Sequence, residues 1–174
     1  KAQAGALAHK SDAGGVAVGI ADEEQLAAAW KQVNAAVKAA APHVKLDGLL
    51  VEAMAPRGGL EMIVGARRDP SWGPVLMVGI GGVLTEVLSD VALIPADANS
   101  AAIERAVRSL KAARLLAGYR GAGPRDVAAL VETLGRLGAI MRASPRLADI
   151  EINPLMVYRA GQGVLALDAL LVMA

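Results

Sequence analysis

The chain has 174 residues, 55% of them hydrophobic, a content that excludes a disordered protein without a core. Its 18 Lys and Arg residues against 17 Asp and Glu residues give a net charge of +1, so neither nucleic acid nor an anionic membrane is an expected partner. Cysteine is absent, which excludes disulfide scaffolds, thiolate metal sites and thiol nucleophiles.

The first predicted elements are one helix and two strands. A helix is expected over Asp22–Ala40, because Asp22 can cap it and apolar residues recur at helical spacing, namely Leu26, Trp30, Val33 and Val37. Leu46–Met54 and Leu60–Arg67 have the pattern of strands, and the turn at Pro56–Gly59 lies between them. These features predict that the two strands pair with each other antiparallel.

Further strands are expected at Pro74–Val78 and Val91–Ile94. The most apolar run, Gly73–Leu84, is too short to span a bilayer, and aromatic residues make up only 2% of the chain, too few for base-stacking platforms. We therefore expect a cytoplasmic protein that binds neither membrane nor nucleic acid.

Two helices and a hairpin complete the predicted elements. The helices are expected at Asn99–Ala117 and Pro124–Met141, with Pro124 in the first turn. The strands of the hairpin are expected at Leu147–Arg159 and Val164–Met173, around the turn Ala160–Gly163. Helices and strands are mixed without strict alternation, which predicts an α+β fold of antiparallel sheets with flanking helices.

The first group of residues that could carry chemistry is Lys1 with the loop His9–Val16. The loop combines an imidazole, an ammonium, a hydroxyl and two glycines before an apolar stretch, and so can present charge and backbone N–H groups to an anion. A solvated polar turn explains the same residues, and spacing alone does not decide.

The second group is formed by Glu61 and Arg67. Both have odd positions on a strand of period two, so their side chains are expected on the same face. A carboxylate and a guanidinium there could bind a ribose hydroxyl and a phosphate, and the alternative is a surface ion pair. The third group is the glycine-rich stretch Gly79–Glu86, which contains Gly81 and Gly82. It is weak evidence by itself because it lacks the later glycine of a dinucleotide fingerprint.

The fourth group lies on the C-terminal hairpin. If Arg159 faces Val164, then Asp168 lies opposite Leu155 and diagonal to Asn153, at about 7–8 Å between Cα atoms. A carboxylate and an amide oxygen at that separation suit Mg²⁺, and Glu151 would share their face. A register change of one residue would remove the site, and exposed polar residues on an edge hairpin are the alternative.

Five strings stand in one order along the chain: Lys1 with His9–Val16, Val51–Met54, Glu61–Pro70, Gly73–Val75 with Gly79–Gly82, and Glu151–Leu155. In that order and at that spacing they resemble the ATP-grasp domain of the NDP-forming acyl-CoA synthetases, and the match is collinear over nearly the whole chain. The resemblance implies an ATP-grasp fold of two α+β lobes, approximately residues 1–55 and 56–174, that clamp a nucleotide between antiparallel sheets. The chain is expected to be a fragment whose N-terminal lobe is incomplete, because it lacks the strands that precede Lys1 in the family.

The resemblance also implies roles for individual residues. Lys1 and Arg67 would contact phosphates, together with the amides of Gly81 and Gly82. The adenine pocket would be lined by the backbone of Val51, Glu52 and Met54, and Glu61 would bind the ribose. Mg²⁺ would be held by Asn153 and Asp168 with help from Glu151. His9 would be a transient phosphohistidine, because imidazole is nucleophilic near neutral pH and leaves readily.

The implied function is that of an acid-thiol ligase module, which transfers a phosphoryl group between phosphohistidine and ADP or GDP, coupled to acyl-CoA thioester chemistry. The CoA-binding and ligase domains, or a partner subunit, would carry the first relay histidine, and an oligomer is expected. Two alternatives remain at this stage: a non-catalytic nucleotide-sensing domain of a protein acetyltransferase, and a purely structural partner subunit.

Overall fold

The computed structural model describes residues 1–5, 7, 10–81 and 90–174. The chain divides into two compact units, Lys1–Ala55 and Pro56–Ala174. These units have the bounds expected for the two lobes, and their assignment as lobes of one domain remains a prediction. No helix among the described residues is both long and apolar enough to cross a membrane.

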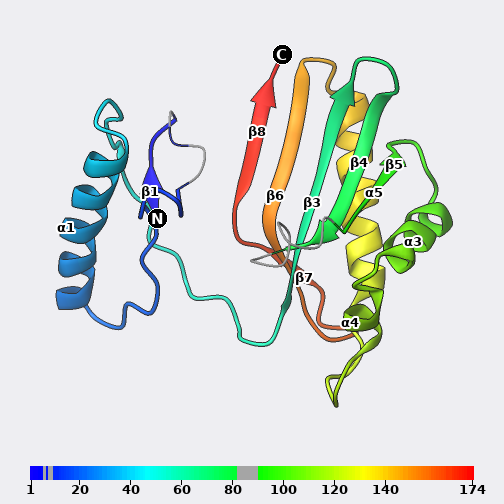
Figure 1. The fold of residues 1–174 in the computed structure, drawn as a ribbon, viewed down its shortest axis with the longest axis horizontal. Coiled ribbons are helices and arrows are strands. Elements are labelled where there is room, and N and C mark those ends of the chain that lie inside the picture. The colour runs from blue at the N-terminus through cyan, green and yellow to red at the C-terminus, as the bar shows by residue number, and fades with distance from the viewer. Residues whose placement is uncertain (6, 8–9, 82–89) are drawn as a thin grey trace. The chain divides into compact units, whose positions relative to one another are not determined.

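The first unit contains a helix and a two-stranded sheet (Figure 1). Strand β1 (Ala2–Gln3) pairs antiparallel with β2 (Gly48–Leu49). The strand expected at Leu46–Met54 is therefore only two residues long, and its expected pairing with Leu60–Arg67 is wrong. The reason is that the strand expected at Leu60–Arg67 is already paired on both edges, with residues 73–80 on one side and residues 149–157 on the other.

Helix α1 (Glu23–Ala40) confirms the helix expected in this unit. The carboxylate of Asp22 caps it by accepting a hydrogen bond from the backbone N–H of Gln25 at 2.8 Å. Gln25 in turn accepts a hydrogen bond from the N–H of Ala21, which completes a reciprocal capping arrangement. Trp30 departs from the predicted pattern, because its side chain is 49% exposed while Val33 and Val37 are buried.

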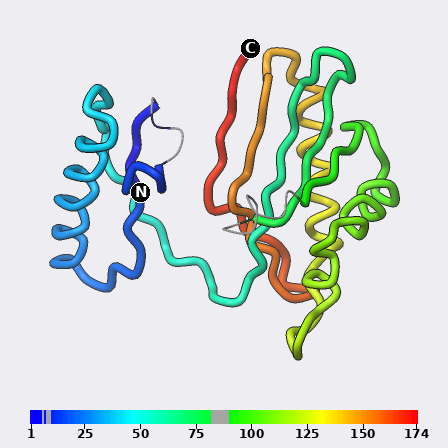
Figure 2. The backbone as a smooth tube through the Cα atoms, in the orientation of Figure 1, coloured from blue at the N-terminus to red at the C-terminus, as the bar shows by residue number. Residues whose placement is uncertain are grey.

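The second unit is built on an antiparallel sheet of six strands, in the order β5–β4–β3–β6–β7, with β8 also paired to β6. Figure 2 shows the C-terminal strand, in red, beside β6, in orange. Two predicted strands differ in extent: β6 ends at Val157, and the last strand is interrupted at Leu167 and Asp168. The strands are β3 (Leu60–Asp69), β4 (Gly73–Ile80), β5 (Val91–Pro95), β6 (Leu147–Val157), β7 (Val164–Ala166) and β8 (Ala169–Met173).

Three helices are described in the second unit: α3 (Ser100–Ser109), α4 (Ala113–Ala117) and α5 (Val127–Ala143). The single helix expected over Asn99–Ala117 is thus interrupted. The cause is the buried carboxylate of Asp90, which accepts the backbone N–H groups of Lys111 at 2.8 Å and Ala112 at 2.7 Å. Pro124 does not lie in the first turn of the next helix, because Asp126 is the N-cap residue.

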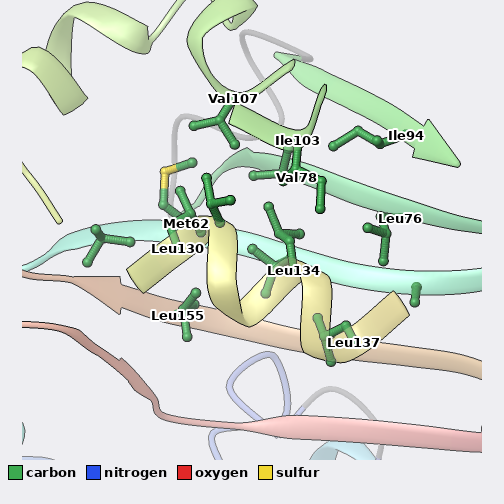
Figure 3. Packing of buried hydrophobic residues seen from close by; sticks show 14 of the residues in the cluster. Met62, Leu76, Val78, Ile94, Ile103, Val107, Leu130, Leu134, Leu137 and Leu155 are labelled. Carbon is green, nitrogen blue, oxygen red and sulfur yellow. The ribbon is translucent and has the colours of Figure 1, made fainter. Parts of the chain in front are cut away.

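The core of the second unit lies between the helices and one face of the sheet. Figure 3 shows Leu130, Leu134 and Leu137 of α5 against side chains of the sheet, and all of them belong to one buried cluster with Met62, Leu76, Val78, Ile94, Ile103, Val107 and Leu155. No described helix of this unit covers the opposite face of the sheet, which we call the open face. The odd-numbered residues of β3, including Glu61 and Arg67, lie on that open face.

Candidate functional site

The open face carries both Glu61 and Arg67, as the sequence predicts. Glu61 pairs with Met156 and Arg67 with Asp149, and both β3 side chains are exposed, while the residues between them are buried. The two residues are six positions apart, which at about 3.3 Å per residue separates their Cα atoms by about 20 Å. One ribose and its adjoining phosphates do not span that distance, so these side chains mark opposite ends of the face.

Arg67 is engaged in an ion pair. Its Nη2 lies 2.6 Å from Oδ2 of Asp149, and its Nε donates a hydrogen bond to the same oxygen at 2.7 Å. The Arg67 side chain is 72% exposed, where such pairs contribute about 0–1 kcal/mol to stability. The structure therefore shows Arg67 in a surface ion pair, and its expected contact with phosphate stays a prediction.

Gly81 lies beside Glu61 at the other end of the open face. The Gly81 N–H donates to the backbone carbonyl of Glu61 at 2.8 Å, and a Cβ at Gly81 would lie 3.0 Å from backbone atoms of Glu61 and Met62. A side chain at this position would push the neighbouring backbone of β3 by a few tenths of an ångström. The hydrogen bond to Glu61 also corrects the expectation that the Gly81 amide donates to a phosphate, because the sheet already uses its hydrogen. Gly82 lies outside the described residues.

The C-terminal hairpin brings Asn153 and Asp168 together, but in a register two residues from the expected one. Val164 faces Val157 rather than Arg159. The N–H of Asn153 consequently donates to the backbone carbonyl of Asp168 at 3.2 Å, so the two residues lie opposite each other instead of diagonally. A shift of two residues preserves the face, whereas a shift of one would have reversed it.

The side chains on this part of the hairpin form a set of oxygen donors. Nδ2 of Asn153 donates a hydrogen bond to Oε1 of Glu151 at 3.3 Å, which places both side chains on one face and leaves Oδ1 of Asn153 as an acceptor. Oδ1 of Asp168 accepts the N–H of Ala169 at 3.1 Å. No group of three or more His, Cys, Asp or Glu side chains that could hold a metal occurs within the described ranges. The set here has two carboxylates and one amide, which are hard ligands of the type that Mg²⁺ takes together with water and phosphate oxygens.

In the first unit, an ion pair joins Lys1 to the segment that was expected to line the adenine pocket. Nζ of Lys1 lies 2.6 Å from Oε2 of Glu52. The neighbouring side chains of Val51 and Met54 are 65% and 64% exposed, and this stretch lies outside any strand. The expected contact of its backbone with adenine stays a prediction. His9 lies outside the described residues, so its expected role stays a prediction.

Asp126, in the second unit, is a residue next to the C-terminal hairpin that the sequence analysis did not identify. Its carboxylate accepts the N–H of Ala129 as the cap of α5 and the N–H of Gly163, at 2.8 Å, in the turn before β7. The hydrogen bond from Gly163, and then that from Ala129, hold the pKa of the Asp126 carboxyl below its ordinary value. An Asp just before an apolar helical pattern indicates an N-cap. The hydrogen bond from the distant Gly163 has no such signal in the sequence.

Comparison with known proteins covers nearly the whole chain. The family model described as an ATP-grasp domain matches residues 1–173. A trans-feruloyl-CoA synthase of an unknown prokaryotic organism is 46% identical over 98% of this chain and 24% of its own length. The beta subunit of an ADP-forming acetate–CoA ligase of Pyrococcus furiosus is 34% identical over 96% of this chain and 71% of its own length. The chain thus spans about a quarter of the synthase and most of the separate subunit.

Two solved structures of an acetyl-coenzyme A synthetase from Candidatus Korarchaeum cryptofilum are similar to the whole chain. One, in complex with coenzyme A and Ca-AMPCP, has a TM-score of 0.93 at 34% identity and covers 100% of this chain and 75% of that one. The other is in complex with coenzyme A and Mg-AMPPCP, with its phosphohistidine segment pointing towards the nucleotide binding site. It has a TM-score of 0.79 at 31% identity and covers 99% and 74%. These matches confirm the α+β fold expected from the sequence.

Proposed function

This chain belongs to the ATP-grasp domain family found in ADP-forming acyl-CoA ligases, and on that premise we propose that it is the nucleotide-binding catalytic module of such an enzyme. The enzyme would be an acid-thiol ligase that couples acyl-CoA thioester cleavage to formation of ATP or GTP. The observation that carries this proposal is the register of the hairpin, which sets Asn153 opposite Asp168 and beside Glu151. The ADP-forming name of the similar subunit supports a nucleoside diphosphate as the phosphoryl acceptor.

Mg²⁺ would be held by the carboxylates of Glu151 and Asp168 and by Oδ1 of Asn153. When bound, it would neutralise charge on the nucleotide phosphates. The chain's own contribution is to hold the ligands in place: the Asn153–Asp168 backbone hydrogen bond fixes their spacing, and the amide of Asn153 orients Glu151. The Mg-AMPPCP complex of the similar synthetase supports this choice of metal.

The nucleotide contacts are proposed residue by residue within each unit. In the first unit, Lys1 would bind phosphate, and the backbone of Val51, Glu52 and Met54 would bind the base. In the second unit, Glu61 would accept hydrogen bonds from ribose hydroxyls, and the amide of Gly82 would donate to phosphate. Arg67 would contact phosphate only by exchanging its ion pair with Asp149, as Lys1 would exchange its ion pair with Glu52.

The chemical step would use His9. In the direction of triphosphate synthesis, the N–P bond of phosphorylated His9 breaks while a terminal phosphate oxygen of the nucleoside diphosphate forms a new O–P bond. With a proton on the ring nitrogen that is not phosphorylated, the imidazole leaves as the neutral base, which is a good leaving group near neutral pH. Positioning and neutralisation of charge account for most of the catalysis of such transfers. The phosphohistidine segment described for the similar synthetase supports this step.

The partners would be the CoA-binding and ligase domains of the same enzyme, fused or in a separate subunit, within an oligomer in the cytoplasm. Both arrangements are supported by similar proteins, one of which is a long synthase and one a beta subunit. The acyl and CoA pockets would lie in those partners.

The test is Mg²⁺-dependent nucleotide binding by the complete enzyme that carries Asp168→Asn. Asn can still accept the N–H of Ala169, so the fold is preserved while a ligand charge is lost. We expect Mg·ADP affinity to fall by about tenfold or more, with metal-free ADP affinity unchanged. Asp97→Asn is the matched control, because Asp97 is an exposed carboxylate in the loop between β5 and α3. Identical Mg·ADP titrations for Asp168→Asn and the parent enzyme would rule out this metal site.

A further inference from the structure

Positive charge is concentrated in one short part of the chain. Residues 105–125 contain six Lys and Arg residues and no Asp or Glu, which leaves 12 cations and 17 acids for all the other residues. The net charge of +1 therefore conceals a basic segment within an otherwise acidic chain. A local excess of this kind produces an electrostatic field that can select a partner of opposite charge.

The structure places four of these cations along α3, α4 and the turn that joins the two helices. Arg105, Arg108, Lys111 and Arg114 follow one another at intervals of three residues, and all four are exposed. On α3, Ile103 and Val107 are buried against the core, so the cations point away from it. Residues three apart on a helix are neighbours on its surface, which makes Arg105 and Arg108 neighbours on α3.

Most of this charge is not neutralised inside the unit. Arg108 forms an ion pair with Glu104, at 2.7 Å between Nη2 and Oε1. Within the described part of the chain, no carboxylate pairs with the side chains of Arg105, Lys111 or Arg114. These cations are thus available to an external anionic group.

The loop after α4 extends the same basic region with an aromatic side chain. Tyr119 is 51% exposed, and the guanidinium carbon of Arg120 lies 5.4 Å from the centre of its ring. The loop folds back closely on itself at its start, because a Cβ at Gly118 would lie 2.6 Å from the carbonyl oxygen of Ala122. Tyr and Arg are the residue types that contribute most at protein interfaces, so this pair is suited to anchor a partner.

We propose that these residues form a docking surface, the basic surface, for an acidic face of the remaining domains or partner subunit of the same enzyme. Its members are Arg105, Lys111, Arg114, Tyr119 and Arg120. The proposal rests on the proposed function for the identity of the partner. A similar synthase has three quarters of its length outside the region matched by this chain, and a similar ligase contains it as a separate subunit, so a protein partner is available in both cases.

A protein face fits this surface better than nucleic acid does. Four of its five members are Arg or Tyr, which are enriched at protein interfaces. The chain outside the basic segment is acidic and would repel a long polyanion, and aromatic residues for base stacking are nearly absent. The surface also lies on the helix side of the sheet, apart from the open face with Glu61 and Asn153, so docking and nucleotide binding can occur together.

Cross-linking of the complete parent enzyme tests the location of the partner. Lys111 is the only lysine in the second unit, so a carbodiimide, which joins an amine directly to a carboxylate, reports on one position there. We expect a cross-link from Lys111 to an Asp or Glu outside residues 1–174, and its yield should fall as salt is raised. Cross-links from Lys111 only to residues within this chain would overturn the proposal.

Charge reversal in the complete enzyme tests the role of the contact. The combination Arg105→Glu, Arg114→Glu and Arg120→Glu should lower the overall rate of triphosphate formation from acyl-CoA by about tenfold, with ADP affinity unchanged. Reversal of Arg136, Arg146 and Arg159, which are exposed in the same unit, gives the same net charge and should leave the rate within about twofold of the parent.

Three outcomes would contradict the docking role: an unchanged rate in the first variant, equal losses in both variants, or loss of binding to nucleic acid with no loss of rate. The far-ultraviolet circular dichroism of both variants should match the parent, because all six positions are exposed. Absence of ADP binding in the parent enzyme would refute the proposed function instead, and the cross-link of Lys111 would then still report whether the basic surface contacts protein.

Discussion

At the scale of single residues, the carboxylate of Asp126 joins two elements that the sequence presents separately. It caps α5 through Ala129 and holds the turn before β7 through Gly163. Asp126→Ala should lower the free energy of unfolding by about 1 kcal/mol, the usual cost of a lost cap. Thermal melts at pH 7 against the parent measure this loss.

The effect of Asp126 should depend on pH in a defined direction. Hydrogen bonds from Gly163 and Ala129 lower the pKa of this carboxyl in the folded state below its ordinary value of 3.8. A lowered folded pKa stabilises the folded state above the unfolded pKa, and the contribution is lost as the pH falls through the folded pKa. The difference in melting temperature between parent and variant should therefore be constant near neutrality and shrink below about pH 3.8. A difference that widens on acidification would contradict this account.

The sequence predicted the face of a side chain where the alternation of a strand sets it. It did not predict contacts that depend on a partner far away in the chain. Strand periodicity was enough to put Glu61 and Arg67 on one face. It could not show that Arg67 pairs with Asp149, 82 positions away, because that contact depends on the pairing of β3 with β6. That Asn153 and Asp168 share a face was likewise predicted. Their register differs from the predicted one, and the turn before β7 is held by a hydrogen bond to Asp126.

At the scale of elements, α5 packs closely against the chain that leads from β5 to α3. A Cβ built on Gly138 would lie 2.4 Å from the carbonyl oxygen of Ala96, a contact that neither backbone can relieve without moving. Gly138→Ala should therefore lower the free energy of unfolding by about 1–3 kcal/mol, as overpacking of a core does. Denaturant unfolding of parent and variant provides the measurement.

Gly135 is a matched control on the same helix. A Cβ there meets nothing within 4 Å, so Gly135→Ala should stabilise the protein by up to about 1 kcal/mol through helix propensity. Opposite signs for the two substitutions are the expected result. Equal stabilisation by both would mean that α5 does not approach Ala96 so closely.

The elements that the sequence misassigned have a common physical cause. The helix expected over Asn99–Ala117 stops because Asp90, about 20 positions earlier, binds the N–H groups of Lys111 and Ala112. The strand expected at Leu46–Met54 shortens because only Ala2 and Gln3 pair with it. Local pattern predicts which stretches are apolar and periodic, whereas long-range hydrogen bonds decide where each element ends.

At the scale of the whole molecule, nucleotide binding and phosphoryl transfer should be separable. Binding is proposed to use Lys1, Glu61 and the hairpin, whereas transfer is proposed to use His9. In the complete enzyme, His9→Ala should therefore leave the rise in melting temperature with Mg·ADP nearly unchanged. It should also abolish covalent labelling from γ-phosphate-labelled nucleoside triphosphate, because no other residue of the module is proposed to accept the phosphoryl group.

The control for His9→Ala is His43→Ala, since His43 is the only other histidine of the chain and is exposed. That variant should be labelled as the parent is, at an acid-labile and base-stable site, as expected for an N–P bond rather than an acyl phosphate. Labelling of His9→Ala to the parental level would refute the relay through His9 while leaving nucleotide binding intact. Loss of the thermal shift together with the label would instead place His9 among the residues that bind nucleotide, because a phosphoryl acceptor alone contributes nothing to the affinity for the diphosphate.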